Sequence, residues 1–431
     1  MKLGYKISLT AVFFFLCLNC KANSTPDFDT HFNDSTLRLD YIFAGDSHSF
    51  GISLDSKSKQ PGWVGRRKNL SKTPLKGNGT ILVTSLETGD TLYMNPFSSL
   101  FQEWIYTPEA SKETQSFENS FLVPLPKEKA MITIELRGNR HEVIATTNHV
   151  YDPADELTKE VGTRSLPHKY LHRGGDSKNV IDVAILAEGY QEEEMDKFLQ
   201  RSQDIVKEIL SYEPFASNKE KFNFVAVLTP SKDSGVSIPL KKQWKDTNFE
   251  SHFSTFHSAR YLTCPRVKKL HQSLEGIPYE HILLLVNTDE YGGGGIYNSY
   301  QIASSDNKFT LPVAVHEFGH SFAGLADEYF YSEEDSDDIV DNTYPIDIEP
   351  WEKNITTLVD FESKWKDLLQ DTQIKEEPEF EGQLGVFKGG GYRSNGIYRP
   401  TYTCRMRDNF YPTFCPVCKE TLREVIEFYT E

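Results

Sequence analysis

The chain has 431 residues, of which 38% are hydrophobic and 13% aromatic. This length is enough for two or three domains, and the apolar content excludes an intrinsically disordered protein. The formal charge of −17 excludes binding through a basic patch, because an acidic surface repels nucleic acid and anionic lipid. We therefore expect no nucleic-acid partner.

The first twenty residues predict a signal peptide. Lys2 and Lys6 precede an apolar run at residues 7–18 that is too short to span a bilayer comfortably. Cys20 lies where a bacterial lipoprotein would be cleaved and acylated, although residues 17–19 are a poor lipobox. We expect an exported protein, either secreted or anchored at the cell surface through a lipid on Cys20, with no other membrane contact.

Residues 21–160 predict an all-β sandwich that would serve as an accessory domain. Short β-branched or aromatic stretches are separated by Gly, Pro, Asn and Asp turns; they cover residues 37–43, 79–86, 90–95, 120–125, 130–138 and 141–147. No cluster of candidate catalytic residues accompanies them. Their expected role is support, anchoring or substrate presentation.

Residues 161–431 predict an α/β domain; a polar linker at residues 150–179 overlaps its start, and the α/β pattern begins after it. The expected strands cover residues 180–190, 222–229, 281–287 and 295–304, and a helix covers residues 191–212. Residues 296–303 alternate in polarity and are a candidate edge strand for pairing with an extended peptide. The preceding glycines, residues 292–295, would then allow close approach or movement at the rim of the cleft. A buried strand after a flexible loop is the alternative. An acidic run at residues 333–341 predicts a solvated loop, with a calcium site as the less favoured interpretation.

Four cysteines follow the signal peptide: Cys264, Cys404, Cys415 and Cys418. The C-x-x-C of residues 415–418 would suit a redox dithiol or half of a zinc knuckle, but a knuckle needs a second ligand pair and only Cys404 is close. In an exported protein we favour a disulfide from Cys404 to Cys415 or Cys418.

The candidate metal ligands and the candidate catalytic residue lie in residues 314–329, AVHEFGHSFAGLADEY. Thr310 is a candidate N-cap and Pro312 suits a first turn, so a helix is expected to begin near residue 311. His316 and His320 are then one turn apart on one face and can bind a single ion. Glu317, one step around the helix, can reach a water on that ion.

A third ligand is expected after the helix. Gly324 lets the chain turn, and Asp327 follows His320 by seven residues. Two imidazoles, one carboxylate and a water make the open site of one catalytic Zn²⁺ ion. Glu328 is the other candidate ligand, or a hydrogen-bond partner of a histidine N–H. The non-catalytic alternative is a buried histidine in the core with the acids in solvent.

The same residues resemble the active-site signature of the IgA-peptidase family of bacterial zinc metallopeptidases: residues 316–322, Gly324 and residues 327–329. Similar segments occur at residues 182–190, 233–236, 391–393, 398–400 and 404–406, so the resemblance covers most of residues 165–431. It implies a zincin-like catalytic domain, with a mixed sheet and an active-site helix, behind an accessory domain. It also implies zinc binding by His316, His320 and Asp327, with Glu317 catalytic.

The signature is also similar to that of the metzincins, H-E-x-x-H-x-x-G-x-x-H. Gly324 is one position late and the third ligand is an acid, so metzincin geometry does not carry over directly. Met406 is a candidate for the methionine beneath the metal, and core packing is the alternative.

These features predict an exported zinc metalloendopeptidase in which Glu317 acts as general base on a zinc-activated water. The expected partner is a polypeptide, host proteins and glycoproteins included, and we expect a monomer. Candidate oxyanion donors are Tyr329, Tyr398 and Tyr402. The residues predict a peptidase and not an IgA-specific one. The alternatives are a surface ligand-binding protein with a degenerate zinc domain, and a zinc amidase acting on a non-protein amide.

Overall fold

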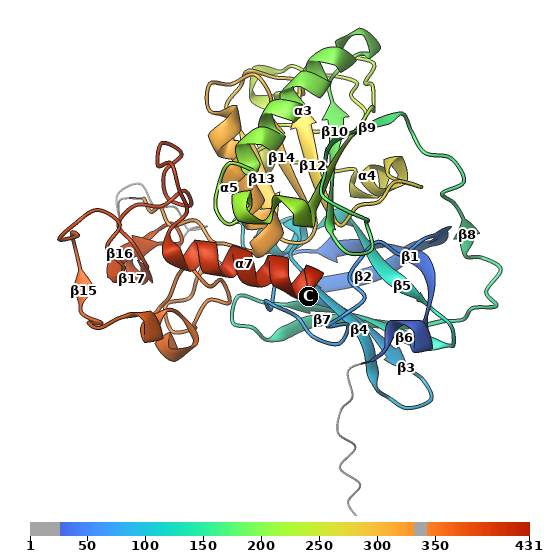
Figure 1. The fold of residues 1–431 in the computed structure, drawn as a ribbon, viewed down its shortest axis with the longest axis horizontal. Helices are drawn as coiled ribbons and strands as arrows, with labels where there is room; N and C mark the ends of the chain where they lie inside the picture. The colour runs from blue at the N-terminus through green and yellow to red at the C-terminus, as the bar shows by residue number, and fades with distance from the viewer. Residues whose placement is uncertain (1–25, 332–342) are drawn as a thin grey trace, which may run out of the picture.

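The computed structural model describes residues 26–331 and 343–431, and these form a mixed α/β molecule with a β-rich amino-terminal region (Figure 1). The predicted signal peptide, Cys20 and the acidic run at residues 333–341 lie outside the described residues. Within the described ranges, no helix has the length and apolar character that crossing a membrane requires.

The amino-terminal region contains two four-stranded sheets, ordered β5-β1-β2-β8 and β4-β3-β6-β7. Their strands are β1 (Phe32–Gly45), β2 (Phe50–Pro61), β3 (Gly79–Ser85), β4 (Thr91–Phe97), β5 (Gln115–Pro126), β6 (Ala130–Arg137), β7 (Val143–Tyr151) and β8 (Lys159–Glu160). Buried residues of both sheets form one hydrophobic cluster. In β6 every second side chain is buried, as expected for a strand with one face on a core.

All six β stretches predicted from the sequence overlap strands of these sheets, and the β-rich character of the region is confirmed. β2 was not predicted. It pairs with β1 along most of its length, yet most of its side chains are exposed or half-buried, so its sequence lacks the apolar alternation that marks a strand.

A six-stranded sheet follows, ordered β13-β14-β12-β10-β11-β9. Its strands are β9 (His168–Arg173), β10 (Ile181–Glu188), β11 (Phe222–Val227), β12 (His281–Val286), β13 (Gly293–Ile296) and β14 (Tyr300–Ser304). The four inner strands are parallel, and both edge strands run antiparallel to their neighbours. The inner strands are buried on both faces, which is why they read as continuous apolar runs.

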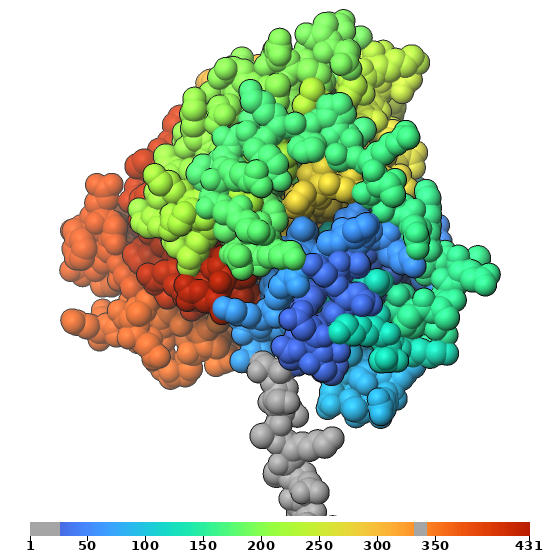
Figure 2. All heavy atoms as spheres, turned by 45° about the vertical axis from the view of Figure 1, so that its right-hand side comes forward, coloured from blue at the N-terminus to red at the C-terminus, as the bar shows by residue number. Residues whose placement is uncertain are grey.

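Helices cover both faces of this sheet. One hydrophobic cluster joins it to α3 (Met195–Ile209), α5 (Thr310–Ala323) and α7 (Pro416–Thr430). A second cluster on the other face includes α4 (Val267–Ser273) and Leu100 from α2 (Leu100–Trp104). Leu100 belongs to the amino-terminal region, so that region packs directly against the α/β part. Figure 2 shows the blue amino-terminal residues against the green and yellow residues.

The predicted strand at residues 295–304 is two strands, and the candidate edge was misplaced. β14 pairs with β12 on one side and β13 on the other, so it is an interior strand that cannot take up a peptide. The edge strand is β13, which comes from the glycine run itself.

The carboxyl-terminal part contains a small sheet of β15 (Ile374–Lys375), β16 (Val386–Gly390) and β17 (Arg393–Arg399), followed by α7. The remaining short elements are α1 (Phe28–His31) and the 3₁₀ turns Glu109–Ser111, Glu192–Glu194, Ala216–Lys221, Pro239–Lys241, Thr255–His257, Phe361–Ser363 and Lys366–Leu368. α7 also contacts the amino-terminal region, where the Arg66 guanidinium lies 5.1 Å from the centre of the Phe428 ring.

Candidate active site

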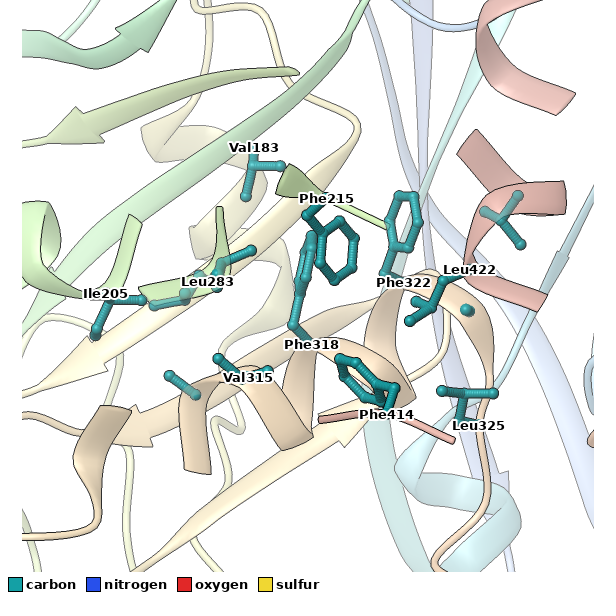
Figure 3. Packing of buried hydrophobic residues seen from close by; sticks show 14 of the residues in the cluster. Val183, Ile205, Phe215, Leu283, Val315, Phe318, Phe322, Leu325, Phe414 and Leu422 are labelled. Carbon is teal, nitrogen blue, oxygen red and sulfur yellow. The ribbon is translucent and has the colours of Figure 1, made fainter. Parts of the chain in front are cut away.

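Helix α5 presents one face to the core and another to the candidate site. Val315, Phe318 and Phe322 point into the cluster that also contains Phe215 and Leu283 (Figure 3). The helix begins at Thr310, one residue earlier than predicted, and Thr310 is not its N-cap. With the apolar side chains buried, the two histidines lie on the remaining face.

The two histidines are oriented by backbone carbonyls. Nδ1–H of His316 donates to the carbonyl of Arg405 at 3.0 Å, and Nδ1–H of His320 donates to the carbonyl of Leu325 at 2.5 Å. A carbonyl can only accept, so each ring carries a proton on Nδ1 and turns Nε2 toward the site. The two Nε2 atoms lie 3.0 Å apart.

Asp327 joins the histidines after a turn at Gly324. Gly324 has φ +54°, and a Cβ there would lie 2.5 Å from the ring of Trp351, so both conformation and space require glycine. The Oδ1 atom of Asp327 lies 2.9 Å from Nε2 of His316 and 3.3 Å from Nε2 of His320. Tyr392 donates its hydroxyl hydrogen to Oδ2 at 2.6 Å. One carboxylate oxygen therefore faces the imidazoles, and the other is held by Tyr392.

Glu328, the other candidate third ligand, does not lie with the histidines. Its Oε1 atom accepts from Asn354 Nδ2 at 3.0 Å and lies 3.1 Å from the Sγ atom of Cys418. Asp327 and Glu328 are neighbours in the chain, yet Asp327 contacts His316 while Glu328 contacts Asn354. Of the two candidates, the structure brings Asp327 to the site and directs Glu328 to a cysteine cluster.

Glu317 lies between the helix and strand β13. A Cβ on Gly293 would lie 3.0 Å from Oε1 of Glu317, and one on Gly295 would lie 2.5 Å from its carbonyl oxygen. The glycines of this run therefore allow close approach of β13 to the helix. Burial raises the pKa of Glu317 above its ordinary value, and the neighbouring His316 and His320 oppose that shift.

Charges within the cluster are strongly coupled. Burial by itself would lower the pKa of His320, but the Asp327 carboxylate outweighs it and raises that pKa to about 9. Burial would raise the pKa of Asp327, yet the two histidines hold it well below its usual range.

The donor atoms of His316, His320 and Asp327 lie within 4.8 Å of one another, as one metal ion requires. Two imidazoles that turn Nε2 toward one carboxylate oxygen supply a donor set that suits Zn²⁺.

Met406 is fully buried beneath the helix. A Cβ on Gly319 would lie 2.8 Å from its sulfur atom, so this glycine lets α5 pack closely on Met406. The Met406 carbonyl accepts from the backbone N–H of Glu328 at 2.8 Å. Met406 therefore supports both the helix and the segment that carries Asp327.

The three candidate oxyanion tyrosines lie in different surroundings. The Tyr329 ring is 5.3 Å from that of Tyr392, next to Asp327. Tyr402 packs against Phe387, and the backbone of Tyr398 pairs with Thr356. Tyr329 is therefore the candidate that lies beside Tyr392, the residue that touches an expected metal ligand.

Three supporting groups were missed from the sequence: Tyr392, the carbonyl of Arg405, and Arg260. Tyr392 and Arg405 fall in segments that carry the family resemblance, and this was their only signal. The Arg260 guanidinium bonds the Tyr331 hydroxyl at 2.5 Å and lies 3.5 Å from that of Tyr329. Nothing in the sequence around Arg260 indicated this position.

A helix bearing H-E-x-x-H, followed by a carboxylate that joins both histidines, is the arrangement of a metal-dependent peptidase. Comparison with protein families agrees. The family model described as IgA Peptidase M64 matches residues 170–376 and 370–426, and the model described as Peptidase M64 N-terminus matches residues 27–147. The chain belongs to this family of metallopeptidases, as the resemblance predicted. No curated protein matches the chain.

Proposed function

We propose that the protein is an exported, zinc-dependent endopeptidase with a zincin-like catalytic domain behind a β-sandwich accessory domain. His316, His320 and Asp327 would hold one Zn²⁺ ion, and Glu317 would be the general base. The observation that carries the proposal is the convergence of two Nε2 atoms and Oδ1 of Asp327 while both Nδ1 atoms are occupied by carbonyls.

Zinc, when bound, polarises the scissile carbonyl and makes water a nucleophile near neutral pH. Glu317 takes a proton from the attacking water and passes it to the departing amine. The Arg405 and Leu325 carbonyls keep both imidazoles in the binding tautomer, and Tyr392 keeps Asp327 turned toward them. Tyr329 is our candidate donor to the developing oxyanion, because it lies beside Tyr392.

The proposed substrate is a polypeptide, and this follows from family membership more than from an open sheet edge. An isolated bridge joins Tyr261 to Gly293, so part of the outer edge of β13 is already paired. A Cβ on Gly294 would lie 3.2 Å from the Leu262 carbonyl oxygen, so the same segment runs close to β13 there as well. Substrate docking by strand addition would be confined to the end of β13 near Ile296.

A degenerate zinc domain on a ligand-binding protein is less favoured. Loss of the general base is the simplest way to silence such a site, and Glu317 remains beside both histidines. The amidase alternative keeps the same metal chemistry and differs only in the amide that is cut, so experiment has to separate it from the peptidase.

The test is cleavage of a diverse peptide mixture by the purified protein, read by mass spectrometry, beside Glu317→Ala. We expect the parent to cut, a chelator to stop it, and the variant to lose at least about a thousandfold in rate. Glu381→Ala, a change at an exposed glutamate, is the matched control and should cut normally.

Equal cutting by the parent and Glu317→Ala would contradict the proposed base. If neither protein cuts peptides while zinc is bound, the peptidase proposal fails. Release of products from peptidoglycan fragments would then support the amidase, and no release would support the binding protein. Export and the monomeric state are separate proposals, tested by fractionation and by mass in solution.

A further inference from the structure

We propose a second metal site, formed by Cys404, Cys415, Cys418 and Glu328 and suited to a structural Zn²⁺ ion. The donor atoms of these four residues all lie within 4.8 Å of one another, and all four residues are buried. The site is separate from the histidine cluster, and the inference does not rest on the proposed peptidase function.

The distances between donors fit a tetrahedral ion. A Zn–S bond of about 2.3 Å places two sulfur ligands about 3.8 Å apart, and a sulfur and an oxygen ligand slightly closer. The Sγ atoms of Cys404 and Cys418 are 3.8 Å apart. Oε1 of Glu328 lies 3.8 Å from Sγ of Cys415 and 3.1 Å from Sγ of Cys418. Three thiols and one carboxylate supply the four ligands that a closed structural zinc site needs.

Backbone N–H groups favour thiolates at this position. Cys415 is the N-cap of α7, and its sulfur accepts from the N–H of Cys418 at 3.4 Å. The N–H of Cys415 points to the sulfur of Cys404 at 3.2 Å. Both a helix N-terminus and a C-x-x-C motif stabilise the deprotonated form that binds metal.

Glu328 supplies an independent sign that a cation belongs here. It has no exposed surface, and its Oε2 atom has no hydrogen-bond partner within the described part of the chain. The Asn354 amide donates to Oε1 of Glu328 and to the Ala326 carbonyl, and not to Oε2. A buried carboxylate with an unpaired oxygen is costly, and a bound ion between Glu328 and the sulfurs would remove that cost.

A metal accounts for the cluster better than the disulfide predicted from the sequence. All four described cysteines are free thiols, and 3.8 Å between the sulfurs of Cys404 and Cys418 is far longer than a bond. A disulfide would use two of three sulfurs and leave an odd buried thiol beside Glu328. Cys264 cannot pair with it, because it belongs to the hydrophobic cluster on the other face of the sheet.

An ion bound by the three cysteines and Glu328 would stabilise the position of the candidate active site. Glu328 follows Asp327 directly, Cys404 lies two residues before Met406, and Cys415 is the N-cap of α7. The second ion would therefore connect the segment that carries Asp327 with the loop that carries Met406 and with helix α7. It would act through position and would touch no substrate.

The test uses cobalt as a spectroscopic probe. Thiolate ligands give Co²⁺ an intense near-ultraviolet charge-transfer absorption, whereas the His316, His320 and Asp327 set contains no sulfur. We expect the purified, reduced protein to show this absorption with Co²⁺ and to bind about two zinc ions per chain by elemental analysis. The double variant His316→Ala with His320→Ala should keep the absorption and about one zinc ion.

Cys415→Ser with Cys418→Ser should lose the absorption and one zinc ion. Cys264→Ser, the matched control, should keep both. Absence of the absorption in the parent protein would overturn the proposal even if the cysteine variants fail to fold. So would a disulfide between Cys404 and Cys418, found by mass spectrometry of the protein purified without reductant from its own export route. Failure of the peptidase proposal would leave the cobalt result unaffected.

Discussion

At the residue scale, the candidate site depends on side chains whose orientation is set by groups from distant parts of the chain. His316 is held by the carbonyl of Arg405 and Asp327 by the hydroxyl of Tyr392. The H-E-x-x-H spacing predicts the histidines because both lie on one helix face. It says nothing about what orients His316 and Asp327, since their partners are 89 and 65 residues away along the chain.

Tyr392→Phe is expected to weaken zinc binding by about tenfold or more, because Asp327 loses the hydrogen bond that orients its carboxylate. The measurement is competition with a chromogenic chelator, combined with peptidase rates at saturating zinc. Tyr402→Phe is the control, since Tyr402 packs against Phe387 and not against an expected ligand. Equal zinc affinity in Tyr392→Phe and the parent would contradict the assigned role.

At the element scale, helix α5 and strand β13 lie close together because the strand consists mostly of glycine. The sequence predicted close approach or movement for the glycine run, and close approach is what the structure shows. It placed the edge one strand too late. Strand order depends on which neighbours each strand pairs with, and local alternation carries no information on that. β2 was missed for a related reason: its place is set by pairing with β1, with little apolar burial.

Gly295→Ala should impair the site. The added Cβ would lie 2.5 Å from the Glu317 carbonyl oxygen and 2.8 Å from Cβ of His320, so strand and helix must separate. We expect a loss of about 1–3 kcal/mol in the free energy of unfolding, together with reduced peptidase activity. Urea unfolding and peptide cleavage measure the two effects.

Gly51→Ala is the matched control, because Gly51 also lies in a strand and its added Cβ would have only an ordinary contact, 3.4 Å from the Ala44 carbonyl oxygen. If Gly295→Ala unfolds and cuts like the parent, β13 does not constrain the helix.

At the scale of the whole molecule, we expect the free energy of unfolding to depend on pH because some histidines are buried. Burial lowers the pKa of His281 to about 3, against an ordinary value of 6.5, and its ring packs against Phe322 and Tyr429. The folded state thus keeps His281 neutral while the unfolded state takes up a proton. The free energy of unfolding is therefore not reduced by His281 at pH values above the pKa of this histidine in the unfolded state. It falls as the pH drops below that pKa.

Between about pH 7 and about pH 5, His281 alone should cost about 2 kcal/mol of unfolding free energy. His281→Leu should reduce the pH dependence by that amount, measured by urea unfolding at both pH values. His48→Leu, at an exposed histidine, should leave it unchanged. An unaltered dependence in His281→Leu would show that this ring is not held neutral in the fold.

The sequence by itself determined the α/β character with a β-rich amino-terminal region, the family, and the His316–Glu317–His320 arrangement. These follow from patterns within a few residues, where periodicity and spacing are set by local backbone geometry. Only the tertiary structure placed Asp327, and not Glu328, beside the histidines, brought Tyr392 to Asp327, and replaced the expected disulfide with a cluster of three thiols and a carboxylate. Such choices depend on which distant neighbour each side chain meets, and that is settled only when the whole chain packs.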